Sequence, residues 1–133
     1  MKKVLFIVAN VGFQDHEFAV PYEAVKNAGY EIEITSGRGG KCRGVFMKSI
    51  EDSKKIIEVD PTRYDLLVFV GGGGAYDQYY LDSDYLHFAK SAKAVAAICI
   101  APSLLSDAGI YQKRQVTGRD DGFGTQVAYL QKN

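Results

Sequence analysis

Residues 94–102 read AVAAICIAP, and this stretch decides the fold of the chain. The run of small and apolar side chains from Ala94 to Ile98 is typical of a buried strand. The residues after Cys99 continue into a helical pattern, so Cys99 lies at a strand-to-helix junction. A tight turn there would hold the cysteine side chain at the start of the following helix, which is the position of a nucleophile elbow.

Three more strands are predicted before this one. Val4–Ala9 is nearly continuous and apolar, as in a central parallel strand that is covered on both faces. Tyr30–Thr35 alternates charged and apolar side chains, which indicates a strand nearer the edge. Asp65–Val70 is the third, and helices are expected at Glu17–Ala28 and at residues 82–92. Strands that alternate with helices predict an α/β domain with a mainly parallel sheet.

The region between the second and third strands is less regular. Glycines interrupt residues 36–63, and Val45–Phe46 and Ile56–Ile57 are short apolar runs that could pair as a small β-hairpin. We interpret this region as an excursion within the domain and not as a linker. Residues 1–133 are therefore predicted to form a single domain.

Composition excludes several classes of function. The chain carries 16 basic and 16 acidic side chains, so no basic surface for nucleic acid or for anionic lipid is expected. Its apolar runs are far shorter than the roughly 20 residues of a membrane-spanning helix. Two cysteines do not make a disulfide framework, which favours a reducing compartment and predicts a cytoplasmic protein.

Candidate functional groups follow three of the four strands. Gln14–Glu17 comes after the first, Gly71–Gly74 after the third and Cys99 after the fourth. The carboxyl ends of parallel strands meet at one edge of a sheet, so these groups are expected to converge. Glycine lets backbone amides approach a reacting oxygen, and one such amide with that of Ile100 would make an oxyanion hole. Taken alone, the glycines could equally be a tight turn and Cys99 a small buried residue.

No cofactor is predicted. The first turn, Asn10–Gln14, holds one glycine where a dinucleotide fold needs several, and Gly74 is followed by Ala75 instead of the lysine and hydroxyl of a P-loop. A metal site is not predicted either, because neighbours such as His16 and Glu17 point about 100° apart on a helix.

Other chemistry-bearing residues have ordinary interpretations. His87 is expected on the surface of its helix, and Cys42 is expected to be a passive residue of a loop. Tyr76, Tyr79 and Tyr80 follow the glycines and could line a pocket, form an interface or simply pack.

Three segments together resemble the ThiJ/PfpI family: Ala96–Pro102, Phe69–Gly72, and Asp15–Phe18 with Pro21. The resemblance covers essentially the whole chain. It implies a flavodoxin-like, doubly wound sheet with a small hairpin excursion and a nucleophile elbow at Cys99. It also implies glyoxalase, deglycase or amide-hydrolase chemistry on small carbonyl compounds.

The resemblance assigns roles to four residues. Cys99 matches the elbow cysteine of the family, and Glu17 matches the acidic residue that hydrogen-bonds to its sulfur. Gly72 and Ile100 match the backbone donors of the oxyanion hole. The pairing is physically reasonable, because a carboxyl shielded from water beside a thiolate is expected to have a raised pKa and to donate to the sulfur.

Two departures from the family pattern concern the third catalytic group. Ile100 stands where protease-like members have histidine, which argues against peptidase activity. Other members take a histidine or a tyrosine from the loop that matches residues 116–120, and this chain has neither there. Arg119 in that loop is a possible anion contact, but it is a poor base because it stays protonated.

A third departure concerns the C-terminus. Relatives continue into a further strand and helix, which this chain is expected to lack. Apolar surface left uncovered would then be buried in a homo-oligomer, unless the chain is a fragment. If the chain is instead a monomer, Phe123, Val127 and Leu130 are predicted to form a helical face that covers the sheet.

Three functional interpretations follow. The first is an enzyme in which Cys99 attacks a carbonyl while Glu17 moves the proton. The second is a redox sensor or chaperone-like protein in which Cys99 is oxidised to a sulfinate held by Glu17. The third is a non-catalytic remnant of the fold that packs as a dimer.

Overall fold

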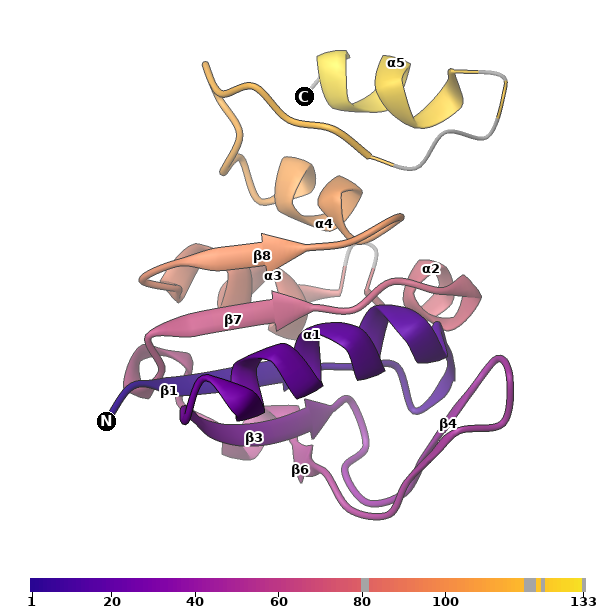
Figure 1. The fold of residues 1–133 in the computed structure, drawn as a ribbon. Helices are drawn as coiled ribbons and strands as arrows, with labels where there is room; N and C mark the ends of the chain where they lie inside the picture. Colours follow the sequence, from indigo (N-terminus) through magenta and orange to yellow (C-terminus); the bar gives the residue numbers. More distant parts are fainter. Residues whose placement is uncertain (80–81, 119–121, 123, 133) are drawn as a thin grey trace.

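The chain forms a five-stranded parallel sheet with helices on both faces (Figure 1). The computed structural model describes residues 1–79, 82–118, 122 and 124–132. The strand order is β6-β3-β1-β7-β8. The bounds are β1 (Lys3–Ile7), β3 (Glu31–Ser36), β6 (Lys54–Lys55), β7 (Leu66–Phe69) and β8 (Val95–Ala97). The predicted flavodoxin-like α/β class and the mainly parallel sheet are confirmed.

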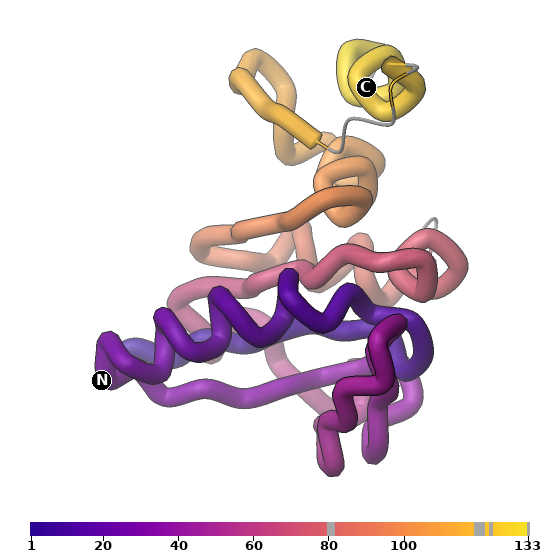
Figure 2. The backbone as a smooth tube through the Cα atoms, turned by 45° about the vertical axis from the view of Figure 1, so that its right-hand side comes forward, coloured from indigo at the N-terminus to yellow at the C-terminus, as the bar shows by residue number. Residues whose placement is uncertain are grey.

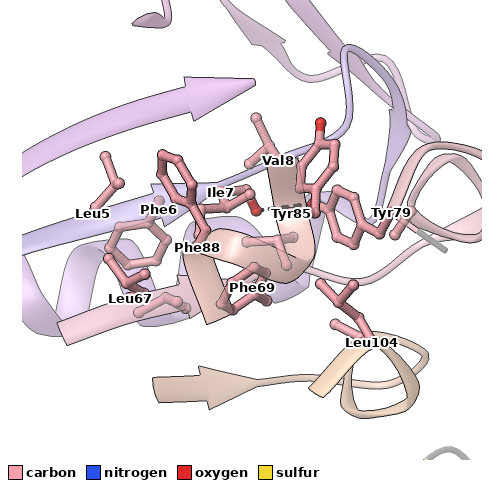
Figure 3. Close-up of a cluster of buried hydrophobic side chains, with 14 of the residues drawn as sticks. Leu5, Phe6, Ile7, Val8, Leu67, Phe69, Tyr79, Tyr85, Phe88 and Leu104 are labelled. Carbon is pink, nitrogen blue, oxygen red and sulfur yellow. Dashed lines mark hydrogen bonds between the residues drawn. The ribbon is translucent and has the colours of Figure 1, made fainter. Parts of the chain in front are cut away.

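Strand β1 occupies the centre of the sheet, as its apolar sequence predicts. Leu5, Phe6 and Ile7 are fully buried. Phe6 packs against Phe18 of α1 (Asp15–Asn27), with ring centroids 5.7 Å apart. Side chains alternate across a strand, so Leu5 and Ile7 face the opposite layer, in the core drawn in Figure 3. A strand buried on both faces has no polar side of its own, which explains the unbroken apolar run.

Helices cover both faces of the sheet. Helix α1 lies on one face, and α3 (Ser83–Ser91) lies on the other (Figure 1). Gln14 caps the start of α1 by accepting the His16 N–H at 2.7 Å, so the helix begins two residues before the predicted Glu17. A further helix, α2 (Gly73–Tyr79), begins within the glycine run and was not predicted.

Strand β8 was expected to be a buried strand, and it is less buried than expected. Among the residues that the structure describes, β8 is at the edge of the sheet and pairs with β7 alone, and Val95, Ala96 and Ala97 are only half-buried. Small side chains are compatible with a buried strand and also with an edge strand. Strand order, which decides between the two, is not encoded in that segment.

The excursion contains a hairpin, but not the predicted one. β4 (Cys42–Gly44) pairs antiparallel with β5 (Ser49–Ile50), and β4 also pairs with β2 (Val11–Phe13). Val45 and Phe46 lie in the turn of this hairpin. Ile56 and Ile57 belong to a 3-10 helix, η1 (Ile56–Glu58), and a second one, η2 (Pro61–Arg63), precedes β7.

The C-terminal helices form a separate layer at one end of the molecule (Figure 2). α4 (Pro102–Asp107) contacts α3, and α5 (Thr125–Lys132) contacts α4 instead of the sheet. The alternative in which Val127 and Leu130 cover the sheet is therefore wrong, and Phe123 lies outside the described residues. In the described part of the chain, no helix is long and apolar enough to cross a membrane.

Candidate active site

Cys99 has the backbone conformation of an elbow. Its φ is +62°, in the left-handed region that side chains other than glycine rarely adopt. The turn is closed by the Ala101 N–H, which donates to the Ile98 carbonyl at 3.1 Å, and α4 starts at Pro102. Conformations of this kind cost about 1–3 kcal/mol and concentrate at functional sites. The strand-to-helix turn expected at Cys99 is thus present.

A pocket of about 590 Å³ opens over this elbow. It brings together four residues that the sequence singled out: Cys99, Glu17, Gly72 and Ile100. Its other lining residues are Gln14, Val45, Gly73 and Tyr76. The carboxyl ends of β1, β7 and β8 supply the chemistry-bearing residues, as expected for the edge of a parallel sheet. Arg119 lies outside the described residues.

Gly71 lies close to both the Cys99 elbow and the carboxyl of Glu17. A Cβ at this position would be 2.4 Å from Oε2 of Glu17 and 3.0 Å from the Cβ of Cys99. Glu17 and Cys99 therefore approach the same point from α1 and from the elbow. Gly71 was predicted only as part of the glycine run, although its place at the end of a strand was a usable signal for this close approach.

The backbone of Gly72 is also held in a conformation that only glycine adopts easily. Its φ is +111°, and a Cβ there would be 2.5 Å from both the Gln14 nitrogen and the Gly12 carbonyl oxygen. The Gln14 N–H donates to the Gly71 carbonyl at 3.0 Å, which joins this loop to the start of α1. These contacts fix the peptide groups of the loop at the rim of the pocket.

One wall of the pocket comes from the hairpin excursion, which the sequence analysis did not connect with the site. Val45 lines the pocket, and the turn that carries it is held by the buried carboxylate of Asp15. This carboxylate accepts the N–H groups of Phe46 and Lys48, both at 2.7 Å. A Cβ at Gly44 would collide with it, at 2.3 Å from Oδ1. Asp15 thus attaches the hairpin to α1.

The aromatic residues after the glycines separate into two roles. Tyr76 lines the pocket, whereas Tyr79 is fully buried and donates its hydroxyl to the Ile7 carbonyl at 3.0 Å. Burial raises the pKa of Tyr79, so its hydroxyl remains a donor. The ring centroids of Tyr79 and Tyr85 are 4.6 Å apart. Figure 3 shows the two rings side by side. Tyr80 lies outside the described residues.

The remaining candidates lie away from the thiol. His16 faces a shallow hollow beside Phe46, and His87 is exposed on α3. Cys42 is buried on β4, where its sulfur contacts the side chains of Asn10 and Ser53. The described residues contain no group of three or more His, Cys, Asp or Glu side chains that could hold a metal ion.

Known proteins have sequences similar to this chain over most of its length. A family model described as the DJ-1/PfpI family matches residues 2–127. The deglycase PfpI of Pyrococcus furiosus is 32% identical, with 98% of this chain and 82% of that protein covered. An uncharacterized protein of Methanocaldococcus jannaschii is 30% identical over 86% of this chain, which spans only 58% of that relative.

Solved structures agree at the level of the fold. A ThiJ/PfpI domain protein from Brachyspira murdochii superposes with a TM-score of 0.87 at 24% identity, over 98% of this chain and 75% of that one. Because the family match extends over nearly the whole chain, the protein belongs to the DJ-1/PfpI family.

Proposed function

We propose that the chain is a cysteine-dependent enzyme that acts on small carbonyl compounds, with glyoxalase or deglycase chemistry. The observation that carries the proposal is the pocket in which Cys99, on a left-handed elbow, shares the space beside Gly71 with the carboxyl of Glu17. The deglycase name of the P. furiosus relative supports the same class of substrate.

The first step of the proposed reaction involves all four residues. The sulfur of Cys99 forms a bond to the carbonyl carbon, and the carbonyl π electrons move onto oxygen. The N–H groups of Gly72 and Ile100 stabilise the negative oxygen. Glu17 takes the thiol proton and returns it to that oxygen, so the adduct is a neutral hemithioacetal.

A second candidate function uses the same thiol without turnover. The side chain that follows the cysteine is Ile100, which offers no base. In a redox sensor, two equivalents of peroxide would convert the thiol to a sulfinate, which Glu17 would hold. The accessible position of Cys99 on the pocket supports this reaction as well.

One pair of measurements separates the two functions. The enzyme proposal would be supported if the wild-type chain consumes methylglyoxal, if Cys99→Ala does not, and if Cys42→Ser still does. Serine suits position 42 because the Cys42 sulfur already contacts polar groups. The sensor would be favoured by two results together. Peroxide would add two oxygens to Cys99, and methylglyoxal would be lost equally with the wild type and with Cys99→Ala.

We also propose that the protein self-associates, as the sequence analysis predicted. The turn of the hairpin carries three large apolar side chains that are more than half exposed: Val45, Phe46 and Met47. Adjacent exposed apolar residues of this kind are typical of surfaces that a partner covers. A second copy of the chain is the partner proposed, and a cytoplasmic location remains part of the proposal.

A further inference from the structure

Gln126 is the buried residue of α5, and its side chain reaches the elbow. Only 7% of this residue is exposed, although the neighbouring residues Thr125 and Val127 are exposed. Its Nε2 donates to the Cys99 carbonyl at 2.9 Å and to Oγ of Ser103 at 3.0 Å. The Ile100 carbonyl lies 3.5 Å from the same nitrogen. A side chain 27 residues away in sequence therefore contacts the backbone of the nucleophile itself.

The chemistry of the partners fixes the orientation of this amide. The carbonyls of Cys99 and Ile100 can only accept hydrogen bonds, so the nitrogen of Gln126 must face them. Its two protons suffice for the Cys99 carbonyl and the Ser103 hydroxyl. Gly118 packs against the amide, where a Cβ would be 2.5 Å from Oε1 and 3.0 Å from Nε2. The side chain is thus closely packed as well as hydrogen-bonded.

A contact of this kind stabilises the strained backbone of the elbow. Cys99 is held in the left-handed region at φ +62°, which its side chain disfavours. Such a conformation persists only where the surrounding structure holds it, and a hydrogen bond to the carbonyl of the strained residue does so directly. If the elbow relaxed, the sulfur would move relative to Glu17 and to the loop at Gly71.

We propose that Gln126 is a positioning residue that holds the Cys99 elbow in its reactive shape, so that helix α5 is part of the active site. The inference rests on the proposed role of Cys99 as the reactive thiol. It does not depend on which carbonyl compound is the substrate, or on whether the thiol turns over.

The test measures alkylation of Cys99 by iodoacetamide as a function of pH, followed by mass spectrometry of the Cys99 peptide. Gln126→Met keeps the length of the side chain and removes its donors. Gln126→Glu replaces the donor with a carboxylate that faces two carbonyls. Gln131→Glu, at an exposed position of the same helix, controls for the added charge.

We expect Gln126→Met to slow alkylation at neutral pH by about two- to tenfold, the rate equivalent of one hydrogen bond, and to move the pH profile upward. Gln126→Glu should give a larger change in the same direction, and Gln131→Glu should match the wild type. If the Gln126 variants fail to fold, Ser103→Ala removes one of the partners of the amide and should give a smaller shift in the same direction.

A purely structural role predicts a different result. The Gln126 variants would then lower the melting temperature while the pH profile of Cys99 stayed that of the wild type, and this outcome would overturn the inference. The outcome is separate from that of the proposed function. The wild type could consume no carbonyl compound while the pH profile of Cys99 still shifts on substitution of Gln126. That result would reject the proposed enzyme activity and support the positioning role.

Discussion

Oε2 of Glu17 occupies the space that the missing side chain of Gly71 leaves free. A Cβ at Gly71 would lie 2.4 Å from that oxygen and 2.6 Å from the Ile98 carbonyl oxygen. The first distance is shorter than any ordinary contact, and the second involves backbone that has little freedom to move. The approach of the carboxyl to the Cys99 elbow therefore depends on a glycine at the end of β7.

This relationship predicts that Gly71→Ala disrupts the site. The added methyl group must displace Glu17 or the elbow, at a cost of about 1–3 kcal/mol in unfolding free energy. Carbonyl consumption should fall at least about tenfold, because a misplaced catalytic group of this kind is costly. A Cβ in Gly73→Ala, at the first residue of α2, would meet no atom within 4 Å, so this variant is the control for stability in urea unfolding. Equal melting temperatures and equal rates for Gly71→Ala and the wild type would contradict the prediction.

The reactivity of the two thiols should differ. We predict that Cys99 reacts with iodoacetamide well below the free-cysteine pKa of about 8.5, and that Glu17→Ala changes that pH profile. Cys42, which is 1% exposed, should react only after unfolding. Glu23 is exposed on α1, the helix that carries Glu17, and Glu23→Ala should leave the pH profile of Cys99 alkylation unchanged. Ordinary and equal titration of both cysteines in the folded protein would disprove the assignment.

Loss of the Asp15 carboxylate should loosen the hairpin. The carboxylate accepts two charge-assisted hydrogen bonds, from the N–H groups of Phe46 and Lys48. We therefore expect Asp15→Ala to lower the unfolding free energy by roughly 2–4 kcal/mol. Asp15→Asn keeps one acceptor oxygen and should lose less. Chemical denaturation measures both variants. Loss of less than about 0.5 kcal/mol in Asp15→Ala, the range of ordinary surface substitutions, would show that the turn does not need this anchor.

The stability of the sheet should depend on pH through Glu33. Hydrogen bonds from Lys54, at 2.6 Å, and from the Tyr64 hydroxyl lower the pKa of Glu33 below its ordinary value of 4.5. The carboxylate therefore stabilises the folded state above pH 4.5, and this contribution is lost as the pH falls through the lowered folded pKa. The difference in unfolding free energy between the wild type and Glu33→Gln should shrink on acidification. A difference that stays constant with pH would argue against these two hydrogen bonds.

Self-association should depend on the hairpin turn. Light scattering of the wild type at micromolar concentration is expected to give more than one chain per particle, and Phe46→Asp should lower that mass. Phe46 is 68% exposed in the single chain, so a charge there should not unfold the monomer. A well-folded wild-type monomer that binds no dye for apolar surface would refute the oligomer.

The sequence by itself determined the class of fold and the participants of the candidate site. An unbroken apolar run such as Val4–Ala9 indicates burial on both faces, which a central strand of a parallel sheet with helices on both sides provides. Polar groups and glycines at the strand ends then converge by topology, which is why the segments Gln14–Glu17 and Gly71–Gly74 and the residue Cys99 were expected at one edge of the sheet. The resemblance to the ThiJ/PfpI family then singled out Glu17 and Gly72 within those segments.

Tertiary structure alone decided which distant segments support these residues. The edge position of β8 depends on strand order, which small side chains in Val95–Ala97 do not encode. Asp15 reads as a first-turn carboxylate of α1, and Gln126 reads as a polar position of a short helix. Each is significant only because folding brings it to a backbone segment 27 or more residues away in sequence. Gln126 reaches Cys99, and Asp15 reaches Phe46 and Lys48. Hydrogen bonds between remote segments leave no periodic pattern in the sequence, so only folding in three dimensions reveals them.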